Sequence, residues 1–518
     1  MSGTGAARIP AIITIIKVHD QLAPMKTALL SVWDKRGLIE LARGLHQAGY
    51  ILMSSGGTGK ALAAAGIPFR EVQDYTGFPE VMGGRVKTLH PRIHGGLLGR
   101  RGVDDEVAAA LGITYIDLLV VNLYPFEEKA AQALPIDDLI EFIDVGGPAM
   151  IRAGAKNFRH VTVVVDPDDY PHLLEEIARD GPDLEKRGIY AARAFARTAA
   201  YDAAISNYLH GIGKTFPTIF TVQFRNGRSL RYGENPHQIA AVYGESGIAA
   251  AVPFQGKAMS YNNYLDLNAA CGLVREFAKP CAVVVKHNNP CGVAIGAEIS
   301  DAYVQARDVD PMAAYGSVVA LNRAVDAALA EEICSTYVEV VAAPGFDDTA
   351  RGVMHRKENM RALLLPDVSV DQEMRSISGG ILVQRTPPYQ ESWVVRTKRA
   401  PDPREMDALS LAWKVCAHTR SNAIIIADEK RTLGIGAGQM SRVDAAQIAV
   451  RKSRFPLLGS SAASDAFLPF PDALEEVAAA GVTALIQPGG SIRDNEVIAA
   501  ADRLEVAMLF TGVRHFRH

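Results

Sequence analysis

The first part of the chain alternates short apolar runs with segments of helical periodicity. Ala28–Val32 suits a buried strand, and four apolar residues then recur with the spacing of one helix face, namely Leu38, Leu41, Ala42 and Leu45. Further strand-like runs lie at Tyr50–Met53, Ile116–Leu123 and Val161–Val165. This alternation predicts an α/β domain with a mainly parallel sheet, whose sites lie at the carboxyl ends of the strands.

The second part is again mixed α/β, and no clear repeat is seen in its sequence. Its strand-like runs are Ala282–Val285, Val318–Leu321, Val340–Ala342 and Ala423–Ile426. The less periodic stretch Leu209–Phe224 predicts a boundary that divides the chain into domains 25–215 and 216–518. Turn formers from Gly379 to Pro403 predict a subdivision near residue 380, and residues 1–24 are predicted to be an N-terminal extension.

Composition narrows the class of protein. A chain of 518 residues is too long for one core, and its net charge of -4 lacks the excess of Lys and Arg that a nucleic-acid backbone needs. No apolar run approaches the roughly 18 residues of a membrane span. Five cysteines without a CxxC pair argue against a disulfide framework or a four-cysteine zinc site. We therefore expect a cytoplasmic protein with no nucleic-acid or membrane partner.

The segment Gly83–Gly96, GGRVKTLHPRIHGG, concentrates positive charge on this acidic chain. Its basic residues are Arg85, Lys87, His90, Arg92 and His94. No Asp or Glu occurs from residue 81 to residue 103. Two interpretations stay open at this point, a site for an anionic ligand and a solvated loop with scattered charge.

A second candidate site is the turn between the predicted strand Tyr50–Met53 and the helix that follows it. Ser54, Gly56, Gly57 and Thr58 lie in this turn, and Ser31 and Lys35 end the preceding strand. Backbone N–H groups and hydroxyls in such a turn bind phosphate, although the same residues also suit an ordinary helix cap. GGTGK at 56–60 lacks the spacing of a P-loop, and GIGAGQ at 434–439 lacks that of a dinucleotide fingerprint.

Candidate acid–base residues follow the later strands of the first domain. Asn122 and Tyr124 end one strand, and Asp144, Gly146, Gly147 and Lys156 come after it. Taken with Lys87, they place a tyrosine, a carboxylate and two lysines near one sheet edge. Such a set stabilises an oxyanion and moves protons. Each group alone would be a turn or a surface helix.

In the second part, Lys286-His287 directly follows a predicted strand. A cation beside His favours neutral imidazole and therefore a general base, whereas the alternative is a strand-end His bonded to backbone. Pro290-Cys291 begins a zinc-deaminase motif, but position 294 is Ala, so no catalytic zinc is expected. Asn422 is a candidate for holding a substrate amide.

Taken in order, these segments resemble the bifunctional phosphoribosylaminoimidazolecarboxamide (AICAR) formyltransferase / IMP cyclohydrolase family of purine biosynthesis. The resemblance covers about Met25 to His518. Its motifs are LLSVWDK, SSGGTGKAL, GFPEVMGGRVKTLHPRIHGGLL, VVNLYPFE, IDVGGPAMIRAGAKN, LRYGENPHQ, VVKHNNPCG, DVDPMAAYGS, SNAI, GIGAGQMSR and SDAFLPF.

For the first domain, the resemblance implies a methylglyoxal-synthase-like fold that closes the formylated intermediate, FAICAR, to IMP. The implied catalytic residues are Lys87, Tyr124, Asp144 and Lys156. The implied nucleotide contacts are Ser31, Lys35, Ser54, Gly56, Gly57, Thr58, Arg85, Thr88, Asn122, Gly146 and Gly147.

For the second domain, the resemblance implies two cytidine-deaminase-like folds without zinc, which transfer a formyl group from the co-substrate 10-formyltetrahydrofolate to AICAR. Lys286 and His287 match the catalytic pair, and Asn422 matches the residue that orients the substrate amide. The implied nucleotide contacts are Arg231, Tyr232, Gly316, Glu339, Arg514 and His518. The implied folate contacts are Tyr315, Gln439, Phe467, Pro469 and Phe470. The family also implies a homodimer with this site at its interface; a bound monovalent cation is left open.

Two residues depart from the family pattern. Trp33 stands where the family usually has a small polar residue, and Tyr315 replaces a usual Phe.

The leading hypothesis is the bifunctional enzyme. One alternative is a chain in which only the formyltransferase works, because Trp33 obstructs the cyclohydrolase site. Another is a nucleotide-sensing module without catalysis.

Overall fold

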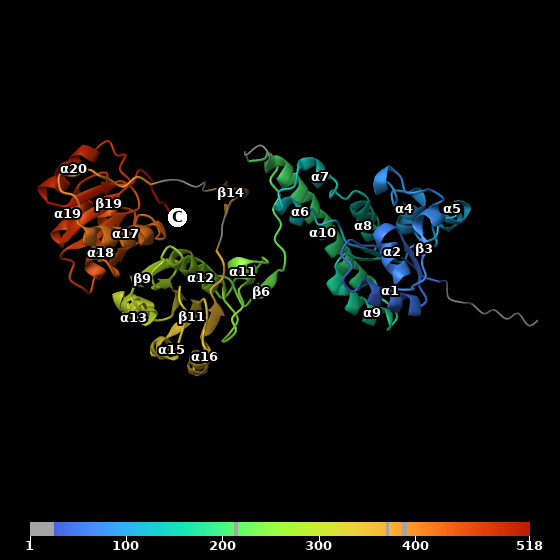
Figure 1. Cartoon of the computed structure of the whole chain (residues 1–518), viewed down its shortest axis with the longest axis horizontal. Coiled ribbons are helices and arrows are strands. Elements are labelled where there is room, and N and C mark those ends of the chain that lie inside the picture. Colours follow the sequence, from blue (N-terminus) through green and yellow to red (C-terminus); the bar gives the residue numbers. More distant parts are fainter. Residues whose placement is uncertain (1–24, 212–215, 369–371, 386–390) are drawn as a thin grey trace, which may run out of the picture. The chain divides into compact units, whose positions relative to one another are not determined.

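The computed structural model describes residues 25–211, 216–368, 372–385 and 391–518. The chain divides into two compact units, Met1–Gln223 and Phe224–His518 (Figure 1). The predicted extension 1–24 and the predicted boundary residue 215 lie outside the described residues. No helix among the described residues is long and apolar enough to cross a membrane.

The sheet of unit 1 is entirely parallel, with strand order β3-β2-β1-β4-β5. Its strands are β1 Thr27–Ser31, β2 Ile51–Ser54, β3 Arg70–Glu71, β4 Leu118–Val121 and β5 Thr162–Val164. The predicted parallel α/β fold is confirmed for this unit. Connections through helices are what a parallel sheet requires.

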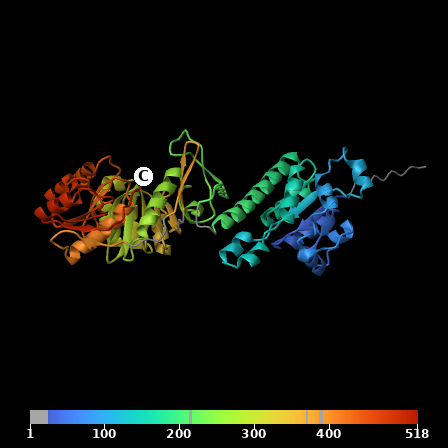
Figure 2. The same ribbon diagram turned by 90° about the horizontal axis from the view of Figure 1, so that it is seen from above.

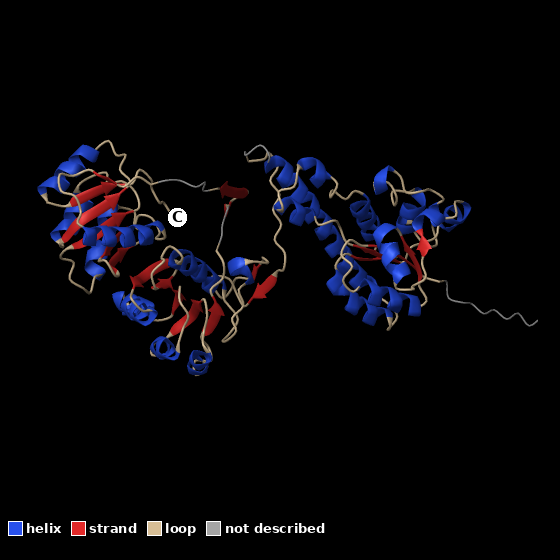
Figure 3. Ribbon diagram, viewed as in Figure 1, coloured by secondary structure: helices blue, strands red, loops and turns tan. Residues whose placement is uncertain are grey.

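Helices cover both faces of this sheet, so successive residues of a strand are buried on opposite sides (Figure 3). On one face, Leu30 of β1 packs with Leu41 of α1 (Leu38–Gln47) and Leu173 of α9 (Tyr170–Ile177). On the other face, Leu29 packs with α4 (Pro91–Leu98) and α8 (Gly146–Lys156). The long α10 (Leu184–Gly211) also covers this second face (Figure 2).

Short elements complete unit 1. They are α2 Gly56–Ala64, α3 Val72–Thr76, η1 Met82–Gly84, α5 Asp105–Ala110, α6 Phe126–Ala131, α7 Ile136–Ile140 and η2 Pro167–Asp169.

Unit 2 contains one five-strand topology twice, and the second sheet carries an additional antiparallel edge strand, β15 (Val394–Val395). The first sheet has the order β12-β11-β10-β8-β9, and the second has β15-β20-β19-β18-β16-β17. In both, an antiparallel hairpin (β8–β9, β16–β17) pairs antiparallel with a third strand (β10, β18), which then begins a parallel run. This duplication agrees with the predicted pair of similar α/β folds, although no repeat was seen in the sequence.

The bounds of the unit 2 strands follow chain order. They are β6 Arg228–Leu230, β7 Ala240–Val242, β8 Cys281–Lys286, β9 Asn289–Ile295, β10 Ser317–Leu321, β11 Val338–Ala343, β12 Arg361–Leu364, β13 Glu373–Ile377, β14 Gly380–Gln384, β15 Val394–Val395, β16 Ile424–Ala427, β17 Thr432–Gly436, β18 Ser460–Ser464, β19 Val482–Gln487 and β20 Ala507–Phe510. The helices are α11 Gly247–Ala250, α12 Tyr261–Val274, α13 Ile299–Val309, α14 Pro311–Ala314, α15 Ala327–Cys334, α16 Asp348–Met354, α17 Pro403–Ala417, α18 Arg442–Lys452, α19 Asp472–Ala479 and α20 Asp494–Arg503.

One hydrophobic core joins the two halves of unit 2. It contains Leu267 of α12 and Leu409 of α17 together with Val283 and Ile425 from the two sheets. The neighbouring edge strands are also tied, because the Val293 N–H donates to the Thr432 hydroxyl at 3.1 Å. The two halves therefore form one packed body, with a seam between β9 and β17.

The glycines of GIGAGQ have a packing role. A Cβ atom at Gly434 or Gly436 would overlap the carbonyl oxygen of Ala449 or Ala445 in α18. Only glycine lets β17 approach that helix so closely. The motif is thus explained by strand–helix contact rather than by a dinucleotide.

Gly436→Ala should lower the free energy of unfolding of unit 2 by about 1–3 kcal/mol, because the added methyl overpacks the β17–α18 contact. Gly352→Ala is the matched control, since Gly352 lies exposed in α16 with no atom within 4 Å of its added Cβ. In that control, the free energy of unfolding should rise by about 0.5–1 kcal/mol, because Ala has a higher helix propensity than Gly. Urea unfolding of the full chain measures both, and equal midpoints would contradict the packing role.

Candidate active sites

A cavity of about 500 Å³ opens at the carboxyl ends of β1 and β4 in unit 1. Twelve of the residues expected from the sequence line it: Ser31, Lys35, Gly57, Thr58, Arg85, Lys87, Thr88, Asn122, Tyr124, Asp144, Gly146 and Gly147. They come from five separate segments, which the parallel sheet brings to one edge.

Three expected residues do not line this cavity. Ser54 is fully buried, and its hydroxyl donates to the Leu30 carbonyl at 2.9 Å, so it ties β2 to β1. Gly56 lines an adjoining pocket of about 180 Å³. Lys156 is exposed at the opposite end of α8 from Gly146, about 15 Å away along the helix axis. Ser55, which lies in the turn predicted to bind phosphate, lines both pockets.

Two lysine ammonium groups meet at the start of α2. Lys87 Nζ lies 3.4 Å from where a Cβ at Gly56 would be, and Lys35 Nζ lies 4.0 Å from the equivalent position at Gly57. Burial lowers the pKa of Lys35, and the charge of Lys87 lowers it further, while Asp34 opposes both. A lysine ammonium beside the N-terminus of a helix is an arrangement that suits a phosphate group.

Asp144 and Tyr124 form the acid–base part of the cleft. Burial raises the pKa of Asp144, although the Gly147 N–H, which donates to Asp144 Oδ1 at 2.8 Å, and the Lys87 charge lower it. Burial also raises the pKa of Tyr124, as does the negative charge of Asp144. The backbone N–H of Asp144 donates to the buried Tyr201 hydroxyl at 2.8 Å, which fixes the main chain that carries the carboxylate.

The cationic segment divides into two functions. Arg85 and Lys87 line the cleft, and exposed Arg85 forms an ion pair with Glu141, an acidic rim residue that nothing in the sequence indicated. His90 caps α4 by accepting from the Arg92 N–H at 3.1 Å. The Arg92 guanidinium donates to the Tyr75 carbonyl at 3.0 Å. His90 and Arg92 therefore stabilise the local fold and do not line the cleft.

Trp33 lines the cleft and does not enter the core. Its side chain is 46% exposed, and its ring centroid lies 5.1 Å from that of Tyr124. The cavity of about 500 Å³ is measured with the indole in place, so Trp33 forms a wall and does not fill the site. Binding pockets for small molecules commonly have about 300–1,000 Å³.

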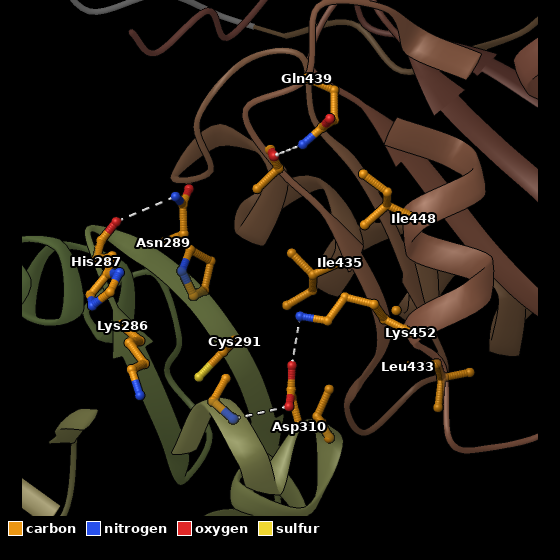
Figure 4. A pocket seen from close by; sticks show the side chains of 15 residues that line it. Lys286, His287, Asn289, Cys291, Asp310, Leu433, Ile435, Gln439, Ile448 and Lys452 are labelled. Carbon is orange, nitrogen blue, oxygen red and sulfur yellow. Dashed lines mark hydrogen bonds and ion pairs between the residues drawn. The ribbon is translucent and has the colours of Figure 1, made fainter. Parts of the chain in front are cut away.

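Unit 2 has a pocket of about 340 Å³ at the seam between its halves (Figure 4). Lys286 and His287 come from the first half and Gln439 from the second. Lys286 Nζ donates to the Tyr315 carbonyl at 2.7 Å, which links the lysine to the end of α14. His287 has a φ of 52°, so the chain turns sharply directly after β8.

An ion pair that sequence reasoning missed spans this pocket. Lys452 Nζ lies 2.7 Å from Asp310 Oδ2, and the two come from α18 and the start of α14 (Figure 4). Burial would raise the pKa of Asp310, but Lys452 and the Ala313 N–H lower it overall. No local signal could have paired residues so far apart in the chain.

The other expected residues of unit 2 lie outside this pocket. Asn422 adjoins it, since its side-chain Nδ2 donates to the Gln439 carbonyl at 2.8 Å. Glu339 accepts from Asn263 at 2.9 Å, and the Gly316 N–H donates to the Tyr337 carbonyl at 2.7 Å. Tyr315 is exposed and stacks on Tyr337.

The remaining nucleotide and folate candidates occupy separate surface positions. Arg231 stacks over the Tyr232 ring at 4.6 Å, and Arg514 over the Phe516 ring at 4.7 Å. The His518 carbonyl accepts from Arg375 and Arg420. Phe467, Pro469 and Phe470 follow β18, and both phenylalanines are exposed. None of these residues lines the pocket that contains Lys286 and His287.

A parallel α/β sheet with a cleft at the carboxyl ends of its strands is typical of enzymes that bind phosphorylated ligands. An MGS-like domain model matches residues 37–149, and the model of the AICARFT/IMPCHase bienzyme matches residues 154–452. The bifunctional purine biosynthesis protein PurH of Magnetococcus marinus is 48% identical over 96% of this chain and 100% of its own length. The bifunctional purine biosynthesis protein PurH of Myxococcus xanthus is 50% identical over 95% of this chain and 100% of its own length.

The chain belongs to the AICARFT/IMPCHase bienzyme family. It is an enzyme of purine biosynthesis with formyltransferase and IMP cyclohydrolase activities, as the sequence predicts. Among solved structures, the crystal structure of ForH is 37% identical and covers 36% of this chain and 98% of its own, with a TM-score of 0.32.

The raised pKa of Asp144 predicts the pH dependence of ring closure. Below that pKa the carboxyl is protonated and cannot accept a proton, so kcat/KM should rise with pH through a value above the ordinary one for Asp. Asp144→Asn should lower ring closure by about 10²–10⁴-fold and abolish this acidic limb. Stopped assays on FAICAR measure kcat/KM as a function of pH. An unchanged acidic limb in the variant would contradict the prediction that Asp144 accepts the proton.

Proposed function

We propose that the two activities are divided between the units: residues 25–215 close FAICAR to IMP, and residues 216–518 transfer the formyl group from 10-formyltetrahydrofolate to AICAR. The observation that carries this division is the convergence of Lys35, Lys87, Tyr124 and Asp144 on one cleft of unit 1. Lys286 and His287 lie together in a different pocket of unit 2.

In ring closure, the carboxamide nitrogen attacks the formyl carbon and loses a proton, while the formyl oxygen gains one. The C–O bond then breaks, water leaves, and the former formamide nitrogen loses its proton. In this proposal, Lys87 polarises the formyl oxygen and Asp144 accepts the first proton, and both residues line the cleft. The Tyr124 hydroxyl, whose raised pKa keeps it protonated, donates to the departing oxygen. Lys35 and the start of α2 hold the phosphate.

In formyl transfer, the amine of AICAR attacks the formyl carbon of the folate, and the bond from that carbon to the folate nitrogen breaks. The amine loses a proton and the folate nitrogen gains one. His287 is the proposed base, and Lys286, held by the Tyr315 carbonyl, is the proposed cation beside the reacting oxygen. Because the amine is a weak nucleophile, orientation by Asn422 and the folate contacts has to supply much of the rate.

A second copy of the chain completes this second site in our proposal, as the family resemblance implies. Tyr315, Phe470 and Arg231 are exposed and do not line the pocket of Lys286 and His287, and this exposure supports a homodimer. We place the enzyme in the cytoplasm.

A monovalent cation fits beside Asp465. This carboxylate is fully buried; Oδ1 accepts from Arg442 at 2.8 Å, and Oδ2 has no hydrogen-bond partner among the described residues. An oxygen left in this state suits a bound cation. Such an ion would hold the segment from Ser421 to Ala423, whose Ala423 N–H donates to the same carboxylate at 3.2 Å.

The decisive experiment supplies the purified full chain with AICAR and 10-formyltetrahydrofolate and measures IMP. We expect IMP to form, and to form from FAICAR alone when folate is left out. Binding of AICAR without turnover would favour a nucleotide sensor. Formyl transfer without ring closure would favour the reading in which Trp33 obstructs the cleft.

Reciprocal variants test the division between units. Lys87→Ala should lower ring closure by about 10²–10⁴-fold and leave formyl transfer intact, whereas Lys286→Ala or His287→Ala should do the opposite. Each variant is the folding control for the other, because both activities are measured on the same protein. Loss of both activities in a folded variant would contradict the division.

A further inference from the structure

We propose that Trp33 is a substrate-binding residue of the ring-closure site, and that its indole forms the wall against which the flat heterocycle of the nucleotide packs. The proposal rests on the proposed function of the unit 1 cleft.

The backbone of Trp33 is fixed directly after β1. Its N–H and that of Asp34 donate to the Asn122 Oδ1 atom at 2.5 Å and 2.8 Å, and Asn122 Nδ2 donates to the Asp34 carbonyl at 3.0 Å. Asn122 is itself buried at the end of β4. The Cα of Trp33 is therefore held at the rim of the cleft.

Two aromatic rings support the indole. Tyr124 lies against it with centroids 5.1 Å apart at 59°, and Phe142 meets it edge-on at 6.1 Å and 80°. These are favourable aromatic geometries, so the indole is packed in one orientation. Nearly half of its surface is still exposed, and it lines the cavity. An exposed, supported aromatic face in a ligand cleft is a stacking surface.

The stacking surface and the phosphate site are joined through one turn. Lys35 Nζ donates to the Trp33 carbonyl at 3.1 Å and also reaches the start of α2. The spacing between an aromatic wall and a cationic phosphate site is thereby set. This arrangement selects a ligand that carries both an aromatic heterocycle and a phosphate, and disfavours a sugar phosphate without a base.

Binding can be followed through Trp33 itself, because it is the only tryptophan of unit 1. The other two, Trp393 and Trp413, lie in unit 2 and both donate to Glu391 Oε2. We expect IMP to quench the tryptophan emission of the full chain, and ribose 5-phosphate to leave it unchanged. In Trp33→Phe, the IMP-dependent quench should disappear.

Steady-state kinetics distinguish a Trp33 that stacks on the substrate from a Trp33 that only supports the Tyr124 ring. Trp33→Leu should raise the KM of ring closure about tenfold with kcat changed less than about threefold, and Trp33→Phe should raise KM less, since it keeps an aromatic face. Formyl transfer in the same variants is the folding control.

Three outcomes would overturn the proposal. They are a fall in kcat at unchanged KM, faster ring closure in Trp33→Leu, and an IMP quench that persists in Trp33→Phe. If wild-type protein fails to close the ring at all, the proposed function of the cleft fails instead.

Discussion

The side-chain amide of Asn122 holds the unit 1 cleft together. It closes three hydrogen bonds between the end of β4 and the turn that follows the neighbouring strand β1. Trp33 and Lys35 lie in or beside that turn, and Tyr124 lies two residues after Asn122. Because Asn122 is buried, loss of its amide would leave backbone N–H groups without partners, at a cost of about 1–3 kcal/mol each. Asn122 thus fixes the turn that carries Trp33 and Lys35 and also lines the cavity itself.

Unit 2 reaches its site by a different route. Two copies of one topology share a core through α12 and α17, and the pocket lies at their seam. The Asp310–Lys452 ion pair and the Val293–Thr432 hydrogen bond both cross that seam. A chain that duplicates a sheet in this way gains a cleft lined by unlike residues, because only the backbone pattern is repeated.

The features that the sequence predicted are those that depend on residues close together in the chain. The buried strand β1 and the four buried residues of α1 followed from hydrophobic spacing alone. Ser54 and Ser55 could not be separated in this way: the last strand residue turns inward to Leu30, and the next residue faces the pocket. The duplication in unit 2 and the pairing of Asp310 with Lys452 depend on contacts between distant segments. Only the three-dimensional structure reveals them.

The cationic segment shows why charge density alone does not locate a site. The Arg92 guanidinium donates a hydrogen bond to the Tyr75 carbonyl, and Arg85 forms an ion pair with Glu141. Among the described residues, Lys87 has no such partner in its own segment, and it lines the cleft near Lys35, whose pKa is lowered by burial and also by the charge of Lys87. In the proposed function, a phosphate dianion bound by Lys35 and the start of α2 raises the pKa of that lysine again, because its negative charge opposes the effects of burial and of Lys87. Binding of the phosphate beside Lys35 then anchors the nucleotide, and Lys87 stays available to act on the formyl group during ring closure.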